Sequence, residues 1–232
     1  MLDDLIDVIP RRQEIKMVID IIHLDQLLSS IYSNIDGFKK AFPSRINNNI
    51  YFDNMEYTNL DYHYSGTSFR KKVRLRWYGH EPIGAKSNLE VKWKKNIYGW
   101  KKRFPVECFE VNSQDNWINL IDNIISSSLP PVNLLLKSNS VPVLLNKYHR
   151  DYYESGDQSV RVTVDTKIET FPQHFRSFIN NSKSFLEANI AVVEIKFDEH
   201  QEDSAIDFLT TSCLRITKYS KYVSGYFNIY PY

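Results

Sequence analysis

The segment from residue 72 to residue 78, which runs Lys-Val-Arg-Leu-Arg-Trp-Tyr, constrains the fold more than any other part of the chain. Successive side chains of a β-strand point to opposite faces of the sheet. Lys72, Arg74 and Arg76 therefore share one face, and the apolar side chains between them share the other. The apolar face can pack against a core. The other face carries three cations with no acid between them, so repulsion requires water or an anion beside it.

Composition limits the class of protein. The chain has 232 residues with 42% hydrophobic and 14% aromatic content, which is enough for a sizeable core and argues against disorder. We identify no linker, and we therefore predict one domain over residues 1–232. The formal net charge of +1 argues against a nucleic-acid binder that works by bulk positive charge. Any basic site must therefore be local and balanced elsewhere in the chain.

Cysteine usage and the N-terminal residues predict a cytoplasmic protein. Cys108 and Cys213 are too few for a disulfide framework, which favours a reducing compartment. Residues 1–7 hold three acids and no basic region, unlike a signal peptide. No apolar run approaches the roughly 20 residues of a membrane span. The sequence indicates neither an oligomeric state nor whether a membrane-anchored partner exists.

Several other segments repeat the alternation of the 72–78 segment. We predict strands at residues 12–20, 50–53, 69–78, 89–94, 99–110, 142–153, 160–167 and 190–197. Helical spacing of apolar residues predicts helices at residues 24–31, 113–129 and 204–213, the second capped by Ser113 or Asp115 and ended by the prolines at 130 and 131. We expect a turn at residues 47–49 and a loop or irregular strand at 57–67, while the pattern of residues 216–225 leaves strand and helix open.

Two architectures satisfy this pattern. In the first, a flat sheet has helices on one side and its charged face in water. In the second, a closed antiparallel barrel has the charged faces inside and the helices outside. The second is favoured because cations outnumber acids on these faces and because an acid recurs two positions before a lysine. Those pairs are Glu14–Lys16, Glu90–Lys92 and Glu194–Lys196.

A barrel lined by arginine and lysine cannot be dry and empty, because each uncompensated buried charge costs several kcal/mol. Such a tunnel needs water and a strongly anionic ligand. Arginine forks suit phosphate oxygens and lysine supplies a point charge. The few acids could hold Mg²⁺ or Mn²⁺ against those phosphates.

With this pattern of segments, the chain resembles the VTC (vacuolar transporter chaperone) domain of the triphosphate tunnel metalloenzyme superfamily. The resemblance covers about residues 11–226 and lies in the order and shared parity of several short segments. These are the basic-then-acidic hairpin, Glu14-Ile15-Lys16, Tyr51-Phe52-Asp53, Arg-Val-Thr-Val-Asp at 161–165, Val-Glu-Ile-Lys at 193–196 and Lys-Tyr-Ser-Lys-Tyr at 218–222. Arg12 stands where the wider superfamily has the first glutamate of Glu-x-Glu-x-Lys, which favours the VTC branch.

The resemblance implies an α+β, mainly β fold, a closed antiparallel eight-stranded tunnel barrel with helices packed outside. It also implies metal-dependent transfer of the γ-phosphoryl group of ATP to a growing polyphosphate chain, with Mn²⁺ or Mg²⁺ as cofactor. By position, the catalytic basic residues are Lys16, Arg74, Arg76, Lys92, Lys196 and Lys221. Further phosphate-binding residues are Arg103, Arg150, Arg161 and Lys218. The metal-binding glutamate is Glu194, and Glu14, Glu90 and Asp165 are either further metal ligands or partners that orient the cations.

Two other functions fit the same scaffold. A hydrolase of triphosphate or nucleoside triphosphates would let water reach the γ-phosphorus. A non-catalytic module would bind polyphosphate or phosphorylated metabolites without turnover. A nucleic-acid binder fits less well, because the chain is nearly neutral and lacks an aromatic-rich basic groove on its loops.

Overall fold

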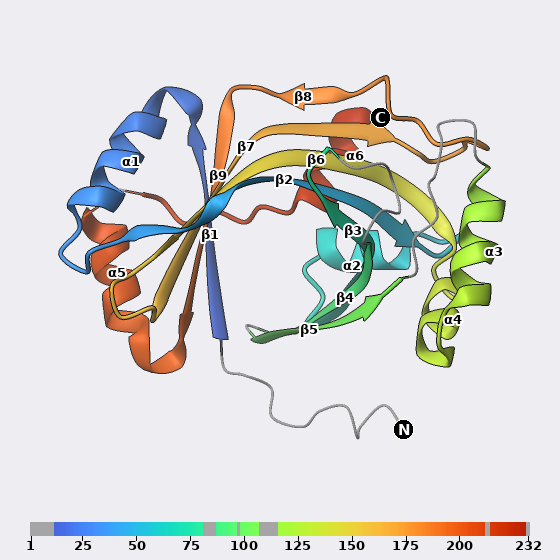
Figure 1. The fold of residues 1–232 in the computed structure, drawn as a ribbon, viewed down its shortest axis with the longest axis horizontal. Coiled ribbons are helices and arrows are strands. Elements are labelled where there is room, and N and C mark those ends of the chain that lie inside the picture. Colours follow the sequence, from blue (N-terminus) through green and yellow to red (C-terminus); the bar gives the residue numbers. More distant parts are fainter. Residues whose placement is uncertain (1–11, 81–86, 97, 107–115, 212–213, 231–232) are drawn as a thin grey trace.

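The computed structural model describes residues 12–80, 87–96, 98–106, 116–211 and 214–230, and its centre is one antiparallel sheet (Figure 1). The strand order is β1-β9-β7-β6-β2-β3-β4-β5, and β8 pairs with β7 outside this path. The strands are β1 (Arg12–Asp20), β2 (Lys39–Asp53), β3 (Phe69–Tyr78), β4 (Asn88–Lys95), β5 (Tyr98–Pro105), β6 (Val141–Glu154), β7 (Val160–Pro172), β8 (Phe185–Glu187) and β9 (Ile190–Asp198). The α+β, mainly β class predicted from the sequence is confirmed.

The predicted closure of the sheet into an eight-stranded barrel is not found. β1 and β5 are the end strands, and among the described residues no backbone ladder joins them. The sheet nevertheless curves until these strands approach each other. A side-chain contact spans the opening, because Lys92 Nζ of β4 lies 2.8 Å from Glu14 Oε2 of β1. The barrel is therefore open in its backbone and bridged by an ion pair.

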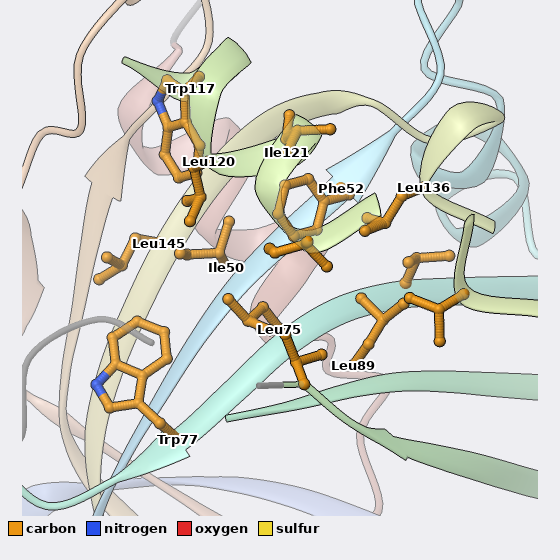
Figure 2. Close-up of a cluster of buried hydrophobic side chains, with 14 of the residues drawn as sticks. Ile50, Phe52, Leu75, Trp77, Leu89, Trp117, Leu120, Ile121, Leu136 and Leu145 are labelled. Atoms are coloured by element: carbon orange, nitrogen blue, oxygen red, sulfur yellow. The ribbon is translucent and has the colours of Figure 1, made fainter. Parts of the chain in front are cut away.

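The outer face of β2, β3 and β4 packs under two helices, α3 (Trp117–Ser127) and α4 (Pro130–Lys137). Figure 2 shows Ile50, Phe52 and Leu75 on the strands beneath Trp117 and the other helix residues. Asn116 caps α3 by accepting a hydrogen bond from the backbone N–H of Ile118. Burying a large apolar side chain contributes about 1.5–3 kcal/mol, so this cluster holds the basic hairpin against the body of the sheet.

A second apolar cluster holds the other end of the sheet. Helices α1 (Leu24–Ser33) and α5 (Glu202–Thr211) cover β1, β7 and β9, and lie at the opposite end of the molecule from α3 and α4 (Figure 1). Met17, Ile31 and Phe208 are fully buried there. All three predicted helices thus pack against apolar strand faces, although Ile206, an apolar residue of α5, is 46% exposed.

Two short helices, α2 (Thr58–Tyr64) and α6 (Lys221–Ile229), pack together at the end of β2. Tyr222 of α6 stacks on Tyr51 of β2, with ring centroids 4.9 Å apart. Its hydroxyl donates to Asp53 Oδ2 over 2.8 Å, and the same carboxylate accepts the backbone N–H groups of Asn59 and Leu60 at the start of α2. Strand parity places Tyr51 and Asp53 on the same face of β2 as Asn49, which pairs in register with Arg76. We call this the polar face of the sheet, and α2 and α6 cover one end of it.

Three local predictions differ from the structure. Residues 47–49 are not a turn but part of the long strand β2, where the asparagines are buried and hydrogen-bonded. The segment 57–67 contains α2 instead of a loop, because Asp53 supplies its N-terminal acceptor. Pro130 and Pro131 begin α4, a position where a missing N–H costs nothing. The caps proposed at Ser113 and Asp115 lie outside the described residues.

Two short 3₁₀ turns, Ile21–His23 and Glu199–Gln201, complete the described elements. No helix in the described part of the chain has the length and apolar character needed to cross a bilayer.

Candidate functional site

The polar face of the hairpin is organised around Glu90. The guanidinium of Arg74 donates twice to Glu90 Oε2, at 3.0 and 2.6 Å, and Arg103 Nε donates to Glu90 Oε1 at 2.9 Å. Arg76 Nη1 lies 3.6 Å from the same carboxylate. Burial works to raise the pKa of Glu90, but Arg74 and Arg76 outweigh it and hold the pKa far below its ordinary value. We call these four side chains the Glu90 cluster.

A second group of charges lies on β1, β4 and β9. Lys16 Nζ lies 2.8 Å from Glu14 and 3.0 Å from Glu194, and Lys196 Nζ lies 3.1 Å from Glu194. Lys92 reaches Glu14 across the opening of the sheet. Burial works to raise the pKa of both glutamates, yet the lysines hold each pKa well below its ordinary value. These five side chains form the Glu194 cluster.

Asp165 of β7 carries a third set of ion pairs. Arg150 Nε and Nη2 donate to its two oxygens over 2.5 and 2.6 Å, and Lys221 at the start of α6 also donates to it. Arg150 Nη2 lies 3.3 Å from Glu194 Oε2 as well, which joins Asp165 to the Glu194 cluster. A fully buried carboxylate shared by an arginine and a lysine is well compensated.

Tyr148 of β6 connects these groups. Its buried hydroxyl accepts a hydrogen bond from Arg76 Nη2 over 3.1 Å. Arg150 and Lys221 lie over its ring, 5.3 and 4.7 Å from the centroid. Burial works to raise the pKa of the phenol, but Arg150 and Arg76 set it below its ordinary value. The phenol thus lies among three cations at the centre of the polar face.

Positive charge exceeds negative charge on this face. The three groups just described and Lys72 bring together nine cations and four carboxylates. Two buried polar atoms nearby, Asn146 Nδ2 and Thr163 Oγ1, have no hydrogen-bond partner among the described residues. Excess cations and an unpaired donor are features that an anionic ligand would satisfy.

The structure brings most of the predicted site residues together. Lys16, Arg74, Arg76, Lys92, Arg103, Arg150, Lys196 and Lys221 all contact one or more of Glu14, Glu90, Asp165 and Glu194. Arg161 and Lys218 are exposed and form no ion pair with any residue in the described ranges. Arg161 pairs in register with Lys196, at the rim of the face.

Three features of the site were not predicted from the sequence. Tyr148, two positions before Arg150 on the same strand face, contacts Arg76 from a different strand. Asn49 accepts a hydrogen bond from Arg76 Nε over 2.7 Å, although residues 47–49 were expected to form a turn. Lys72 donates to Ser220 Oγ over 2.8 Å, a contact between residues 148 positions apart that no local pattern could indicate.

The carboxylates suit a metal ion only in part. Among the described residues, no group of three or more histidine, cysteine, aspartate or glutamate side chains is arranged to hold one. Glu14 and Glu194 do lie close together, since both contact Lys16. Mg²⁺ is commonly bound by one or two carboxylates plus substrate phosphates and water. The residues therefore fit a divalent ion that enters together with a phosphate ligand.

Known proteins place this arrangement in a family. The family model described as the VTC domain matches residues 11–230 of the chain. The chain belongs to the VTC domain family. The resemblance inferred from the sequence is thereby confirmed, and the match covers every described strand of this VTC domain.

Two solved structures resemble this VTC domain, and the first of them supports its fold. A protein from Vibrio parahaemolyticus, described as a "putative adenylate cyclase", superposes with a TM-score of 0.51 at 11% identity and covers 91% of this chain and 97% of that one. The Mediator head module of Schizosaccharomyces pombe has a TM-score of 0.48 at 9% identity, covering 88% of this chain and 96% of that one. No curated protein sequence matches the chain.

Proposed function

We propose that this VTC domain binds ATP and inorganic triphosphate or polyphosphate on its polar face, and transfers the γ-phosphoryl group of ATP to a growing polyphosphate chain. The single observation that carries the proposal is the excess of cations on the polar face. The curved sheet surrounds this face, and α2 and α6 cover one end of it. A phosphate chain carries negative charge along its whole length, so it matches a row of cations drawn from several strands.

In this proposal the arginines of the Glu90 cluster and of β6 hold phosphate oxygens through paired N–H groups. Lys16, Lys92, Lys196 and Lys221 supply point charges around them, and Arg103, Arg161 and Lys218 extend the positive surface toward solvent. Glu90 and Asp165 keep the arginine side chains oriented while the site is free. The sheet would then draw its open edge together around the ligand and complete the tunnel, since Lys92 and Glu14 already span that edge.

Phosphoryl transfer needs positioning and charge stabilisation more than covalent help from the protein. Arg74, Arg76 and Arg150 would fix the transferred group in line with the acceptor. A Mn²⁺ or Mg²⁺ ion held by Glu194, with Glu14 beside it, would supply neutralisation of charge on the phosphates. The acceptor is an already ionised chain end, so no strong base is required.

A binding module without turnover is the competing function, and one observation favours it. All four carboxylates of the face are engaged by cations, which leaves none free as a metal ligand before phosphate arrives. A hydrolase would differ by letting water attack the γ-phosphorus.

The test is the product formed from ATP and Mn²⁺. Polyphosphate chains on a gel, absent with Arg76→Met protein, would support the polymerase. Free phosphate in place of chains would select the hydrolase. Saturable ATP binding with neither product, in Mn²⁺ and in Mg²⁺, would leave the binding module.

A further inference from the structure

We propose that Lys72 is a further phosphate-binding residue, one that holds a part of the anionic ligand between β3 and the start of α6. This inference rests on the proposed function and extends it to a position that the family resemblance does not assign. Lys72 shares a strand face with Arg74 and Arg76, so it points to the same side of the sheet.

Lys72 differs from the other cations of the face in its partner. Each of the eight others contacts a carboxylate. Lys72 Nζ instead donates to the neutral hydroxyl of Ser220, and it forms no ion pair with any residue of the described ranges. Ser220 is itself fixed, because its hydroxyl oxygen also accepts the backbone N–H of Val223 as the N-cap of α6. The ammonium is thus held in place with its charge uncompensated.

The groups that face Lys72 from neighbouring elements are mostly positive. They are Lys16 on β1, Arg74 on β3 and Lys92 on β4. Glu14 is the acid that acts on it most strongly, and Glu14 is already engaged by Lys16 and Lys92. Burial and these cations lower the pKa of Lys72 well below its ordinary value.

His63 of α2 also lies near Lys72, but it adds no charge. Burial, with Lys72 and Arg70, lowers the pKa of His63 to about 2. Its Nε2 lies 3.1 Å from the carbonyl oxygen of Lys71, to which the neutral ring donates. None of these neighbours forms an ion pair with Lys72, whereas a phosphate would, and its negative charge would raise the pKa of the amine.

Proton uptake is therefore a signature of Lys72 as a ligand. Arginine keeps its charge at any accessible pH, so Lys72→Arg keeps the cation and removes the titration. Binding of sodium tripolyphosphate without metal is measured by calorimetry at pH 8 in Tris and in HEPES, which differ in ionisation enthalpy. Protons taken up by the ligand itself cancel when the two proteins are compared.

Lys71→Met is the matched control, since Lys71 lies next to Lys72 on the same strand and on the opposite face. We expect Lys72→Met to bind tripolyphosphate ten- to a hundredfold more weakly than Lys71→Met. We expect Lys72→Arg to retain affinity within about threefold of wild type and to take up fewer protons. The unliganded Lys72→Met protein should melt no lower than wild type, because an uncompensated cation is lost.

Equal affinity of Lys72→Met and Lys71→Met, or equal proton uptake by wild type and Lys72→Arg, would overturn the inference while leaving the proposed function intact. Failure of the wild-type protein to bind tripolyphosphate would overturn both. If Lys72→Met does not fold, the comparison of wild type with Lys72→Arg still decides the question.

Discussion

Lys92 of β4 and Glu14 of β1 form a 2.8 Å ion pair across the opening of a sheet whose end strands share no described backbone ladder. The contact holds the curved sheet in shape where hydrogen bonds between strands are missing. A partly exposed pair of this kind is worth about 0–1 kcal/mol, so it can open when a ligand requires it.

The first prediction concerns this contact. Glu14→Gln should increase amide hydrogen exchange in β1 several-fold while β6 and β7 stay protected, because the bridge from β4 to the end strand β1 is weakened. Glu56→Gln, an exposed position in the loop after β2, is the matched control. Unchanged exchange in β1 would show that the ion pair does not hold the sheet edge.

The second prediction concerns how much the Glu90 cluster contributes to the free energy of unfolding. Arg74→Met should lower the free energy of unfolding by about 1.5–3 kcal/mol, the range for a lost hydrogen bond to a charged group. The loss stays below the 3–5 kcal/mol of an uncompensated buried charge because Arg76 and Arg103 remain near Glu90. Urea unfolding of Arg74→Met, Glu90→Gln and the double variant measures the coupling. A fully additive double variant would contradict the pairing.

The third prediction concerns the stability of the folded protein at acidic pH. The pKa values of Glu14, Glu90 and Glu194 are held below their ordinary values in the folded protein. The unfolded chain, with glutamate pKa values of about 4.3, therefore binds more protons as pH falls, and stability drops from about pH 5 downward. Urea midpoints at pH 7, 5 and 3 test this. Glu194→Gln should lose less stability between pH 5 and 3 than wild type. An equal loss would show that Glu194 does not contribute to the instability in acid.

Sequence alternation could predict the strands and the inward cations because parity is a local property. Lys72 to Tyr78 has a clean period of two, and the structure keeps it. The same logic found Lys16, Lys92 and Lys196, which meet at Glu14 and Glu194.

What the sequence could not predict depends on partners far along the chain. The three asparagines of residues 47–49 favour a turn by local propensity, but Arg76 and Asn146 satisfy Asn49 within a strand. Helix α2 forms where Asp53 accepts its first N–H groups, and the same aspartate binds Tyr222 169 positions away. The ion pair of Lys92 with Glu14 spans 78 positions, and it is compatible with both an open and a closed sheet.

The fourth prediction concerns the metal. Removing the charge of Glu194 should make the face more positive, so Glu194→Gln should bind tripolyphosphate at least as tightly as wild type without metal. If Glu194 also holds a divalent ion, the variant should lose the Mn²⁺-dependent increase in ATP affinity. Calorimetry with and without Mn²⁺ separates the two effects, with Glu187→Gln on β8 as the control. An unchanged Mn²⁺ effect would assign Glu194 to cation pairing alone.

The central claim is that the polar face of this VTC domain binds a phosphate chain, and titration with tripolyphosphate in metal-free buffer tests it most directly. We predict saturable binding that raises the free energy of unfolding by about 2.7 kcal/mol at 100 times the dissociation constant. Arg76→Met should weaken the binding at least tenfold, while Lys102→Met, exposed on the opposite face of β5, should not. No binding at millimolar tripolyphosphate, or equal binding by these two variants, would contradict the claim.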